Sequence, residues 1–173
     1  MEESGGKWIF FHYFSRLIEK NQVATFIGDY TCKVDSKGRI ILPMAFKKQM
    51  PADAQDHFVV KKDIHSKCLL LYTKDEWERH LEKIRRLNRF NREHSKFLRN
   101  YFMGTAELML DNNNRILVPK RLMDLIDADR DVVLAGQDNV IEIWPADIYN
   151  SSAMSPEELS ELSEKLLGNI NEP

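Results

Sequence analysis

The sequence predicts an α+β fold built from two copies of one structural unit, and three observations lead to this prediction. Two ten-residue stretches nearly repeat: VDSKGRIILP at 34–43 and LDNNNRILVP at 110–119 share Asp, Arg, Ile and Pro at the same spacing. Each stretch is followed by a short helical pattern and then by two β-rich runs. The segment between the copies is highly charged and has helical periodicity. Such a long internal repeat indicates two similar units within one chain.

The first unit is expected at residues 24–77. It opens with an extended segment, turns tightly at 36–38, and continues into a short strand that Pro43 ends. Pro43 also suits the start of a helix, because its φ is fixed near the helical value. The runs predicted as strands are FIGDYTCKVD, RIILP, HFVVKK and CLLLY, and the predicted helix is PMAFKKQM.

The second unit, expected at residues 104–150, repeats this plan. Its tight turn places Asn114 where the first unit has Gly38. The turn favours positive φ, which glycine adopts freely and which asparagine tolerates better than most residues. The exchange therefore supports the alignment of the two units. The runs predicted as strands are TAELMLD, RILVP, DVVLAG and VIEIW, and the predicted helix is KRLMDLID.

A helical linker is expected at 78–103, as two helices with a break near 88–91. From residue 74 to residue 103 there are nine Lys or Arg against five Asp or Glu. These cations are expected to form a solvated face or a surface complementary to an acidic neighbour, and contact with DNA phosphates is the alternative. The apolar face of the first helix is expected to comprise Trp77, Leu81, Ile84 and Leu87.

Two terminal segments lie outside the units. Residues 151–173 are expected to form an acidic helix and tail, in which Ser155 caps the helix and Glu158 completes a capping box. Residues 1–23 form an N-terminal extension with a dense aromatic cluster. This extension is either a genuine helical arm or sequence from upstream of the native start, and the second interpretation is favoured.

The composition limits the class of partner. The 173 residues carry a formal net charge of −2, so any surface that binds an anion must be a local patch. Cys32 and Cys68 have no disulfide or metal spacing, which is typical of free thiols in a reducing cytoplasm. No apolar run reaches the roughly 20 residues that a membrane helix needs. We therefore expect a cytoplasmic protein without a membrane partner.

The sequence lacks the usual motifs of enzymes. Its five histidines show no metal-ligand spacing, and neither cysteine lies in a nucleophile motif with a histidine. The glycine motifs that bind phosphate groups are also missing from the sequence. We expect no catalytic residue, no metal site, no cofactor and no small-molecule substrate.

The repeated Asp and Arg are the candidate binding residues. Arg39 and Arg115 each follow a tight turn, and we expect the guanidinium to project outward toward phosphate oxygens or guanine. Asp35 and Asp111 are expected to fix the Arg or to accept amide hydrogens of the turn. An ion pair that only stabilises a turn is the alternative for either motif alone. Repetition with the same flanking residues favours a binding role.

The sequence resembles a known family in the stretches FIGDYTCKVDSKGRIILPMAFKKQM, CLLLYTKDEW, LDNNNRILVPKRL and DVVLAGQDNVIEIW. They look like MraZ, a bacterial family with two SpoVT-AbrB-type units, over roughly residues 24–150. The resemblance implies a swapped-hairpin, AbrB-like β-barrel whose two units pack as a pseudo-dimer. It also implies a ring-shaped homo-oligomer that binds double-stranded DNA. In that family the protein regulates transcription, typically as a repressor of the division and cell-wall gene cluster containing its own gene, through short direct repeats upstream. The resemblance therefore also implies a cytoplasmic protein associated with the nucleoid.

Carried over by position, the resemblance implies particular roles for residues of the two motifs. The DNA-binding candidates are Lys37, Arg39 and Arg115, with Lys33 nearby, and the supporting or turn residues are Asp35, Gly38, Asp111 and Asn114. The second motif departs from the family pattern, because Asn113-Asn114 replace the common Gln-Gly pair and no Lys matches Lys37. Its role stays open between DNA contact and packing between chains.

A third class of function is a non-catalytic interaction module, similar to an antitoxin whose barrel binds DNA weakly and whose tail inhibits a toxin. Proteins of that kind usually carry one barrel unit and a disordered tail. This chain has two units and a tail with helix-capping residues, so the regulator is preferred.

Overall fold

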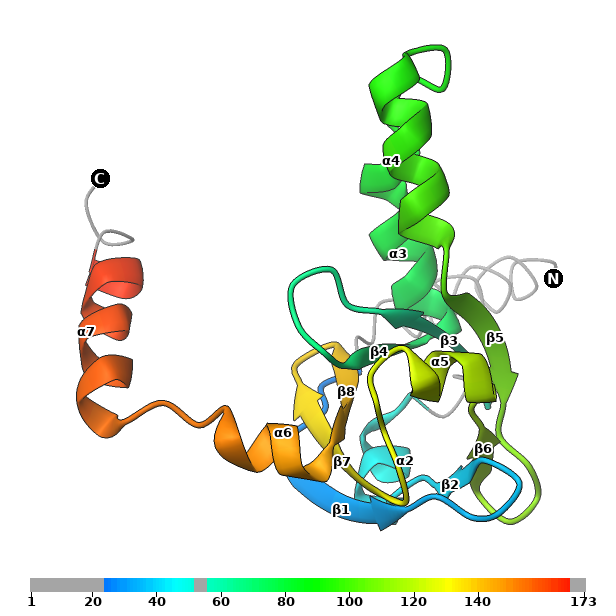
Figure 1. The fold of residues 1–173 in the computed structure, drawn as a ribbon, viewed down its shortest axis with the longest axis vertical. Coiled ribbons are helices and arrows are strands. Elements are labelled where there is room, and N and C mark those ends of the chain that lie inside the picture. Colours follow the sequence, from blue (N-terminus) through cyan, green and yellow to red (C-terminus); the bar gives the residue numbers. More distant parts are fainter. Residues whose placement is uncertain (1–23, 52–55, 169–173) are drawn as a thin grey trace, which may run out of the picture.

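The computed structural model describes residues 24–51 and 56–168 (Figure 1). Expectations about the extension at 1–23 fall outside these residues. The strands are β1 (Asp29–Lys33), β2 (Arg39–Ile41), β3 (His57–Lys62), β4 (Leu69–Thr73), β5 (Thr105–Met109), β6 (Arg115–Leu117), β7 (Asp131–Gln137) and β8 (Val140–Pro145). The helices are α2 (Met44–Gln49), α3 (Lys74–Ile84), α4 (Arg92–Phe102), α5 (Lys120–Asp124), α6 (Ala146–Ser151) and α7 (Pro156–Leu167).

An antiparallel sheet organises the molecule. Six strands are ordered β1-β7-β8-β4-β3-β5, and β2 and β6 form a separate two-stranded ribbon. Every strand run that the sequence predicts overlaps one of these strands, which confirms the α+β class. The short helix α6 at the end of the second unit was not among the predicted elements.

The two units are joined by strand pairing rather than by side-chain contacts alone. The first strand of each unit pairs with the third strand of the other: Tyr30 of β1 lies opposite Leu134 of β7, and Leu108 of β5 lies opposite Phe58 of β3. The ribbon β2–β6 and the contact β4–β8 also join one unit to the other. The strand order is therefore the same read from either end, and the units share one body.

One hydrophobic core lies inside this body. Ile40 and Ile116 face each other across the ribbon and are fully buried. Phe46 of α2 and Leu122 of α5 occupy matching places in the two units and are also fully buried. Burial of each such side chain contributes about 1.5–3 kcal/mol, so replacing Ile40 by Ala would cost about 2–5 kcal/mol. The core thus holds the ribbon in a fixed position.

The linker forms a helical arm of α3 and α4 that rises from the end of the body opposite the β2–β6 ribbon (Figure 1). The side chain of Thr73 caps α3, and the side chain of Asn91 caps α4 by accepting from two backbone N–H groups. The predicted break is confirmed. The helical face was expected to extend to Leu87, but α3 ends at Ile84 because the chain must reverse before α4.

An aromatic cluster fastens the arm to the sheet. Trp77 and Tyr101 pack there with Tyr72 of β4, and the His80 ring stacks on both Trp77 and Tyr101. The buried ammonium of Lys61 lies 4.2 Å from the centre of the Tyr101 ring, an attractive cation–π geometry. The foot of the arm is therefore rigidly packed.

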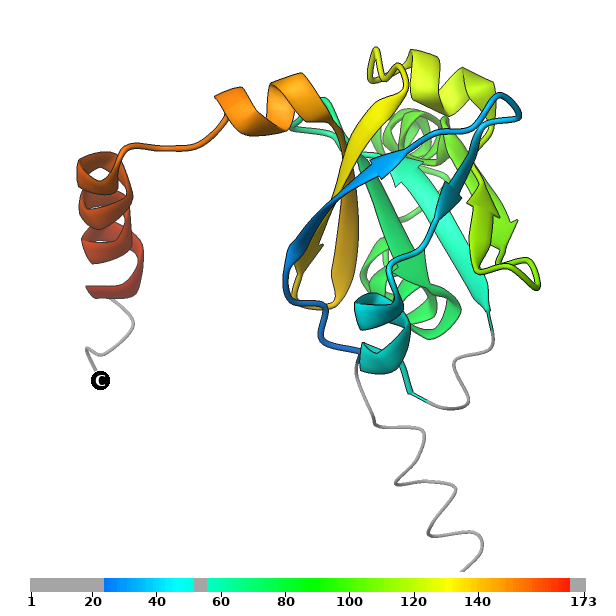
Figure 2. The same ribbon diagram turned by 90° about the horizontal axis from the view of Figure 1, so that it is seen from below.

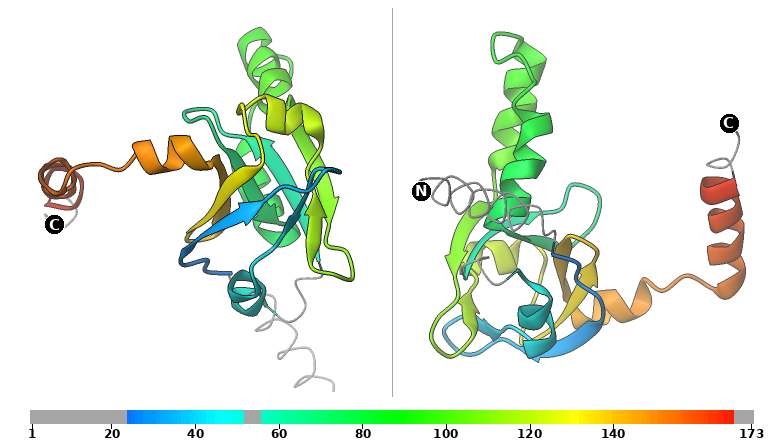
Figure 3. Two further views of the ribbon diagram at one scale, coloured as in Figure 1. Left: turned by 60° about the horizontal axis from the view of Figure 1, so that its bottom comes forward. Right: turned by 180° about the vertical axis from the view of Figure 1, so that it is seen from behind.

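The C-terminal helix α7 extends from the body on its own (Figure 3). The predicted capping box is confirmed: Ser155 Oγ accepts from the N–H of Glu158 at 3.1 Å, and a Glu158 carboxylate oxygen accepts from the N–H of Ser155 at 2.9 Å. None of its residues is buried. The sequence thus specifies the helix through its cap, without burial of its side chains.

Candidate nucleic-acid interface

The first repeated motif forms a closed hairpin turn, called here the first tip (residues 35–39). One carboxylate oxygen of Asp35 accepts from the backbone N–H groups of Lys37, at 2.8 Å, and Arg39, at 3.0 Å. The other oxygen accepts from Nε of Arg39 at 2.7 Å. The Gly38 N–H donates to the carbonyl of Asp35 at 2.9 Å and closes the turn. A single carboxylate therefore fixes both the backbone and the arginine.

The second tip (residues 111–115) has nearly the same geometry. Asp111 accepts from the N–H groups of Asn113, at 2.8 Å, and Arg115, at 3.0 Å. Its second oxygen accepts from Nε of Arg115 at 2.8 Å. We expected each Asp either to fix its Arg or to accept turn amides, and at both tips it does both.

The turn residues Gly38 and Asn114 both have positive φ, at 83° and 56°. A Cβ added to Gly38 would lie 3.2 Å from the carbonyl oxygen of Val118, so both conformation and space favour glycine. The carbonyl of Gly38 accepts from the N–H of Val118, and that of Asn114 accepts from the N–H of Leu42. Each tip is thus fastened to the other unit, which makes both tips rigid.

The arginine side chains differ from expectation. We expected outward-projecting guanidinium groups, but the side chains of Arg39 and Arg115 are only 28% and 26% exposed. The reason is the hydrogen bond from Nε to the neighbouring carboxylate, which folds each side chain along its own turn. With Nε engaged, the Nη end of Arg39 is the part that remains for a partner, whereas Nη2 of Arg115 also lies 2.8 Å from a carboxylate oxygen of Asp111.

Both aspartates are ionised under ordinary conditions. The backbone N–H of Arg39 is the largest cause that lowers the pKa of Asp35, to about 2. The side-chain hydrogen bond from Arg115 similarly lowers the pKa of Asp111. The carboxylate clamps therefore keep their charge, and each tip keeps its shape, across the neutral pH range.

Cations surround the first tip. Lys37 is exposed within the turn, and the Lys33 side chain is 84% exposed while its Nζ lies 3.1 Å from Asp131. Arg130, which sequence reasoning missed, is also exposed and begins beside this tip, because its carbonyl accepts from the Val34 N–H at 2.8 Å. Only the pairing of β1 with β7 could have revealed Arg130, since no motif contains it.

The second tip has different neighbours at the matching positions. Met109, 65% exposed, replaces Lys33, and Asn113 replaces Lys37. The Leu110 N–H donates to the carbonyl of Asp56, whereas the matching N–H of the first tip donates to the carbonyl of Arg130. Lys47 lies close but donates to Oδ1 of Asn114 at 2.6 Å. The second tip thus has the same scaffold with far less positive charge.

The ribbon between the tips carries a mixed outer surface. Arg39 lies opposite Leu117, and Ile41 lies opposite Arg115, while the alternate residues point into the core. Ile41 and Leu117 are exposed although they are large and apolar. Figure 2 shows the blue first tip and the yellow-green second tip on the same side of the body. One face therefore presents both tips with exposed apolar groups between them.

The residues that the structure describes contain no cluster of three or more His, Cys, Asp or Glu suited to a metal ion. Nor do they contain a helix long and apolar enough to cross a membrane. Cys32 and Cys68 are free thiols, as expected, and burial raises the pKa of both, that of Cys68 to about 12. Neither thiol is therefore a ready nucleophile.

Comparison with known proteins gives a consistent result. A family model described as "MraZ protein, putative antitoxin-like" matches residues 25–100 and 101–169. The chain is 38% identical over 149 residues to a protein named transcriptional regulator MraZ from Flavobacterium psychrophilum, covering 86% of this chain and 95% of that protein. It is 37% identical over 144 residues to a protein of the same name from Christiangramia forsetii, covering 83% and 93%. A further match of that name, from Alkaliphilus metalliredigens, is 33% identical and covers 82% of this chain and 98% of that protein.

Proposed function

This chain belongs to the MraZ family, and we propose that it is a transcriptional regulator that binds double-stranded DNA through its first tip. The observation that carries the proposal is Arg39, clamped by Asp35 in a rigid turn with exposed cations around it. The relatives are named as regulators of transcription, which supports the same conclusion.

The proposed contact uses two kinds of cation. The Nη end of Arg39 is preorganised for a forked contact, either with guanine N7 and O6 in the major groove or with a phosphate. Lys37, Lys33 and Arg130 supply phosphate contacts around it. Because the net charge of the chain is −2, this local cluster must provide the attraction. The second tip contributes less, since it lacks those cations.

We propose that the shared body is a swapped-hairpin, AbrB-like barrel. The exchange of β1 and β5 between units supports this architecture. In this proposal the repeated units span 24–77 and 104–150, with the linker at 78–103 between them. Their pseudo-symmetry suits repeated DNA sites.

The proposed target is a set of short direct repeats upstream of the division and cell-wall gene cluster that contains the gene for this chain. Several chains would assemble into a ring, so that first tips engage successive repeats and repress the cluster. Such a protein would act in the cytoplasm, associated with the nucleoid. Multiple weak tip contacts joined in one ring would raise the overall affinity without new interactions.

A second candidate is an antitoxin-like interaction module. It is favoured by α7, whose leucines are unburied, and by the description of the matching family model. In this alternative the barrel binds DNA weakly and the tail binds a protein partner. The regulator remains preferred because the charge is concentrated at a rigid tip.

Fluorescence anisotropy would test the proposal with a labelled duplex from upstream of the gene, a scrambled duplex, and two salt concentrations. We expect preference for the natural duplex and a steep loss of affinity as salt increases, because phosphate contacts release counterions. Equal binding of both duplexes, or an affinity independent of salt, would contradict the proposal and favour the interaction module.

A further inference from the structure

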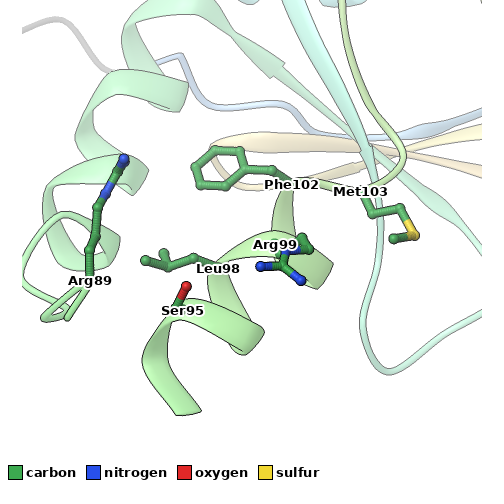
Figure 4. Close-up of a pocket in the computed structure, with 6 residues that line it drawn as sticks. All are labelled: Arg89, Ser95, Leu98, Arg99, Phe102 and Met103. Atoms are coloured by element: carbon green, nitrogen blue, oxygen red, sulfur yellow. The ribbon is translucent and has the colours of Figure 1, made fainter. Parts of the chain in front are cut away.

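The arm carries an open hollow along one face of α4. Six residues line it: Arg89, Ser95, Leu98, Arg99, Phe102 and Met103. Figure 4 shows Arg89 and Arg99 on either side of Leu98. Phe102 and Met103 add exposed apolar surface next to them. The hollow is therefore a positively charged groove with an apolar floor, of about 540 Å³.

Helix α7 has the complementary character. Its twelve residues include four Glu against one Lys, and Glu157 and Glu158 lie in the first turn. Leu159, Leu162 and Leu166 recur at helical spacing and form one apolar stripe, and none of them is buried. An isolated helix of this length is only marginally stable in water, even when it is well capped. Stable helix formation therefore calls for a surface that buries the leucines.

The chain does not cover its own groove with α7. Figures 1 and 3 show the arm and α7 leaving different parts of the body and lying well apart. Only residues 152–154 separate the end of α6 from the cap Ser155, and each residue extends the chain by at most about 3.6 Å. This short connection keeps α7 away from the arm groove of its own chain.

We infer that α7 of one chain docks in the arm groove of a second copy. Leu159, Leu162 and Leu166 would cover Leu98 and Phe102, while the acidic residues of α7 meet Arg89 and Arg99. Apolar burial supplies the affinity, and opposite charges set the orientation and select this partner.

The proposed contact is heterologous, because the donor helix and the acceptor groove are different surfaces. Repeated contacts of this type generate a closed ring when the rotation between chains allows closure. The inference thus rests on the part of the proposed function in which chains assemble, and it names the surfaces that join them. The arm lies away from the tips, so assembly would leave the DNA face open.

Sedimentation equilibrium across a range of concentrations tests the contact with the full chain and two variants. We expect the wild type to exceed its chain mass of 20.3 kDa. A chain that ends at Met154 lacks α7, and the variant Arg89→Glu with Arg99→Glu reverses the groove charge. Each should raise the dissociation constant by about tenfold or more, because each removes apolar burial or turns attraction into repulsion.

The matched control is Arg86→Glu with Lys96→Glu, two exposed cations of the same arm that do not line the groove. It should associate like the wild type. A thiol crosslink supplies independent evidence: chains with Leu162→Cys, mixed with chains that carry Ser95→Cys, should join through a short bismaleimide. Chains of either kind alone should give far less product.

Four outcomes would overturn the inference, and they identify what failed. A wild type of single-chain mass would also refute ring assembly, whereas unchanged association without α7 would refute only this contact. If a chain without residues 1–23 fails to associate while a chain without α7 still associates, the groove binds another segment than α7. If the groove variant keeps its mass but binds DNA more weakly, the groove contacts DNA instead.

Discussion

The two hairpin tips have the same turn geometry but different surroundings. At both, an Asp accepts two backbone N–H groups and the Nε of an Arg, with each distance matching its counterpart to within 0.1 Å (2.8, 3.0 and 2.7 Å against 2.8, 3.0 and 2.8 Å). Only the first tip has exposed Lys33, Lys37 and Arg130 beside it. The comparison separates the residues that build the turn from those that we expect to meet DNA.

This difference teaches how to interpret a repeated motif. The Asp and the Arg recur because both turns use them as a clamp, so their repetition alone does not separate a scaffold from a DNA contact. We expect the cations that vary between the copies to decide which of the two arginines binds DNA. The second tip uses Asn114 to hold Lys47 of α2, and thus contributes a contact between the units.

The largest expected effect comes from removing the arginines one at a time. Arg39→Ala should weaken binding to the natural duplex by about 1–3 kcal/mol, which is roughly five- to 150-fold, because a forked base contact is lost. Arg115→Ala should change affinity less than about threefold by the same measure, since few cations support that tip. Anisotropy measures both, and circular dichroism confirms folding. Equal losses for the two variants would erase the distinction between the tips.

The turn residues provide the second comparison, in stability. Gly38→Ala should lower the free energy of unfolding by about 1–3 kcal/mol, because alanine is strained at positive φ and its Cβ meets the Val118 carbonyl. Asn114→Gly should cost about 1 kcal/mol, since it loses the hydrogen bond from Lys47 and a weak one to the Met44 sulfur, while glycine adopts the positive φ freely. Urea denaturation measures both values. A more damaging Asn114→Gly would show that the second tip is the more important scaffold.

A smaller effect is expected from exchanging the tip charges. Lys37→Asn should weaken binding to all duplexes alike and reduce the salt slope by about 1, as for one lost phosphate contact. The reciprocal Asn113→Lys should increase the affinity and the salt slope if the second tip also faces the phosphate backbone of DNA. The slope of affinity against salt concentration is the measurement. No change in slope for Lys37→Asn would remove Lys37 from the interface.

The smallest effect concerns acid. The Asp35 pKa is lowered from 3.8 to about 2 in the folded protein, so its contribution to stability is complete above pH 3.8 and is lost as pH falls through 2. The stability difference between the wild type and Asp35→Asn should therefore be constant near neutrality and shrink between pH 4 and 2. Thermal unfolding at several pH values tests this. A stability difference that grows as the pH falls would contradict the expected loss of the Asp35 contribution in acid.

Much of this structure could be predicted from local sequence patterns. The strands, the capped helix α7 and the Asp–Arg clamps depend on residues close in the chain, where spacing and turn chemistry decide the outcome. The pairing of β1 with β7 depends on contacts about a hundred residues apart, which no local pattern reports. Arg130 was missed for that reason. The Arg39 side chain is less exposed than we expected, because the local hydrogen bond from its Nε to Asp35 holds it along the turn.

The central claim is that the first tip contacts DNA and the second does so much less. Two variants, Lys37→Cys and Asn113→Cys, would test it. Each cysteine is labelled with a photoactivated aryl azide, and crosslinking to the natural duplex is measured. The raised pKa of the Cys32 and Cys68 thiols favours selective labelling of an exposed tip cysteine. We predict strong, sequence-dependent crosslinking from position 37 and little from position 113. Equal crosslinking from both positions, or crosslinking only from position 113, would contradict the account.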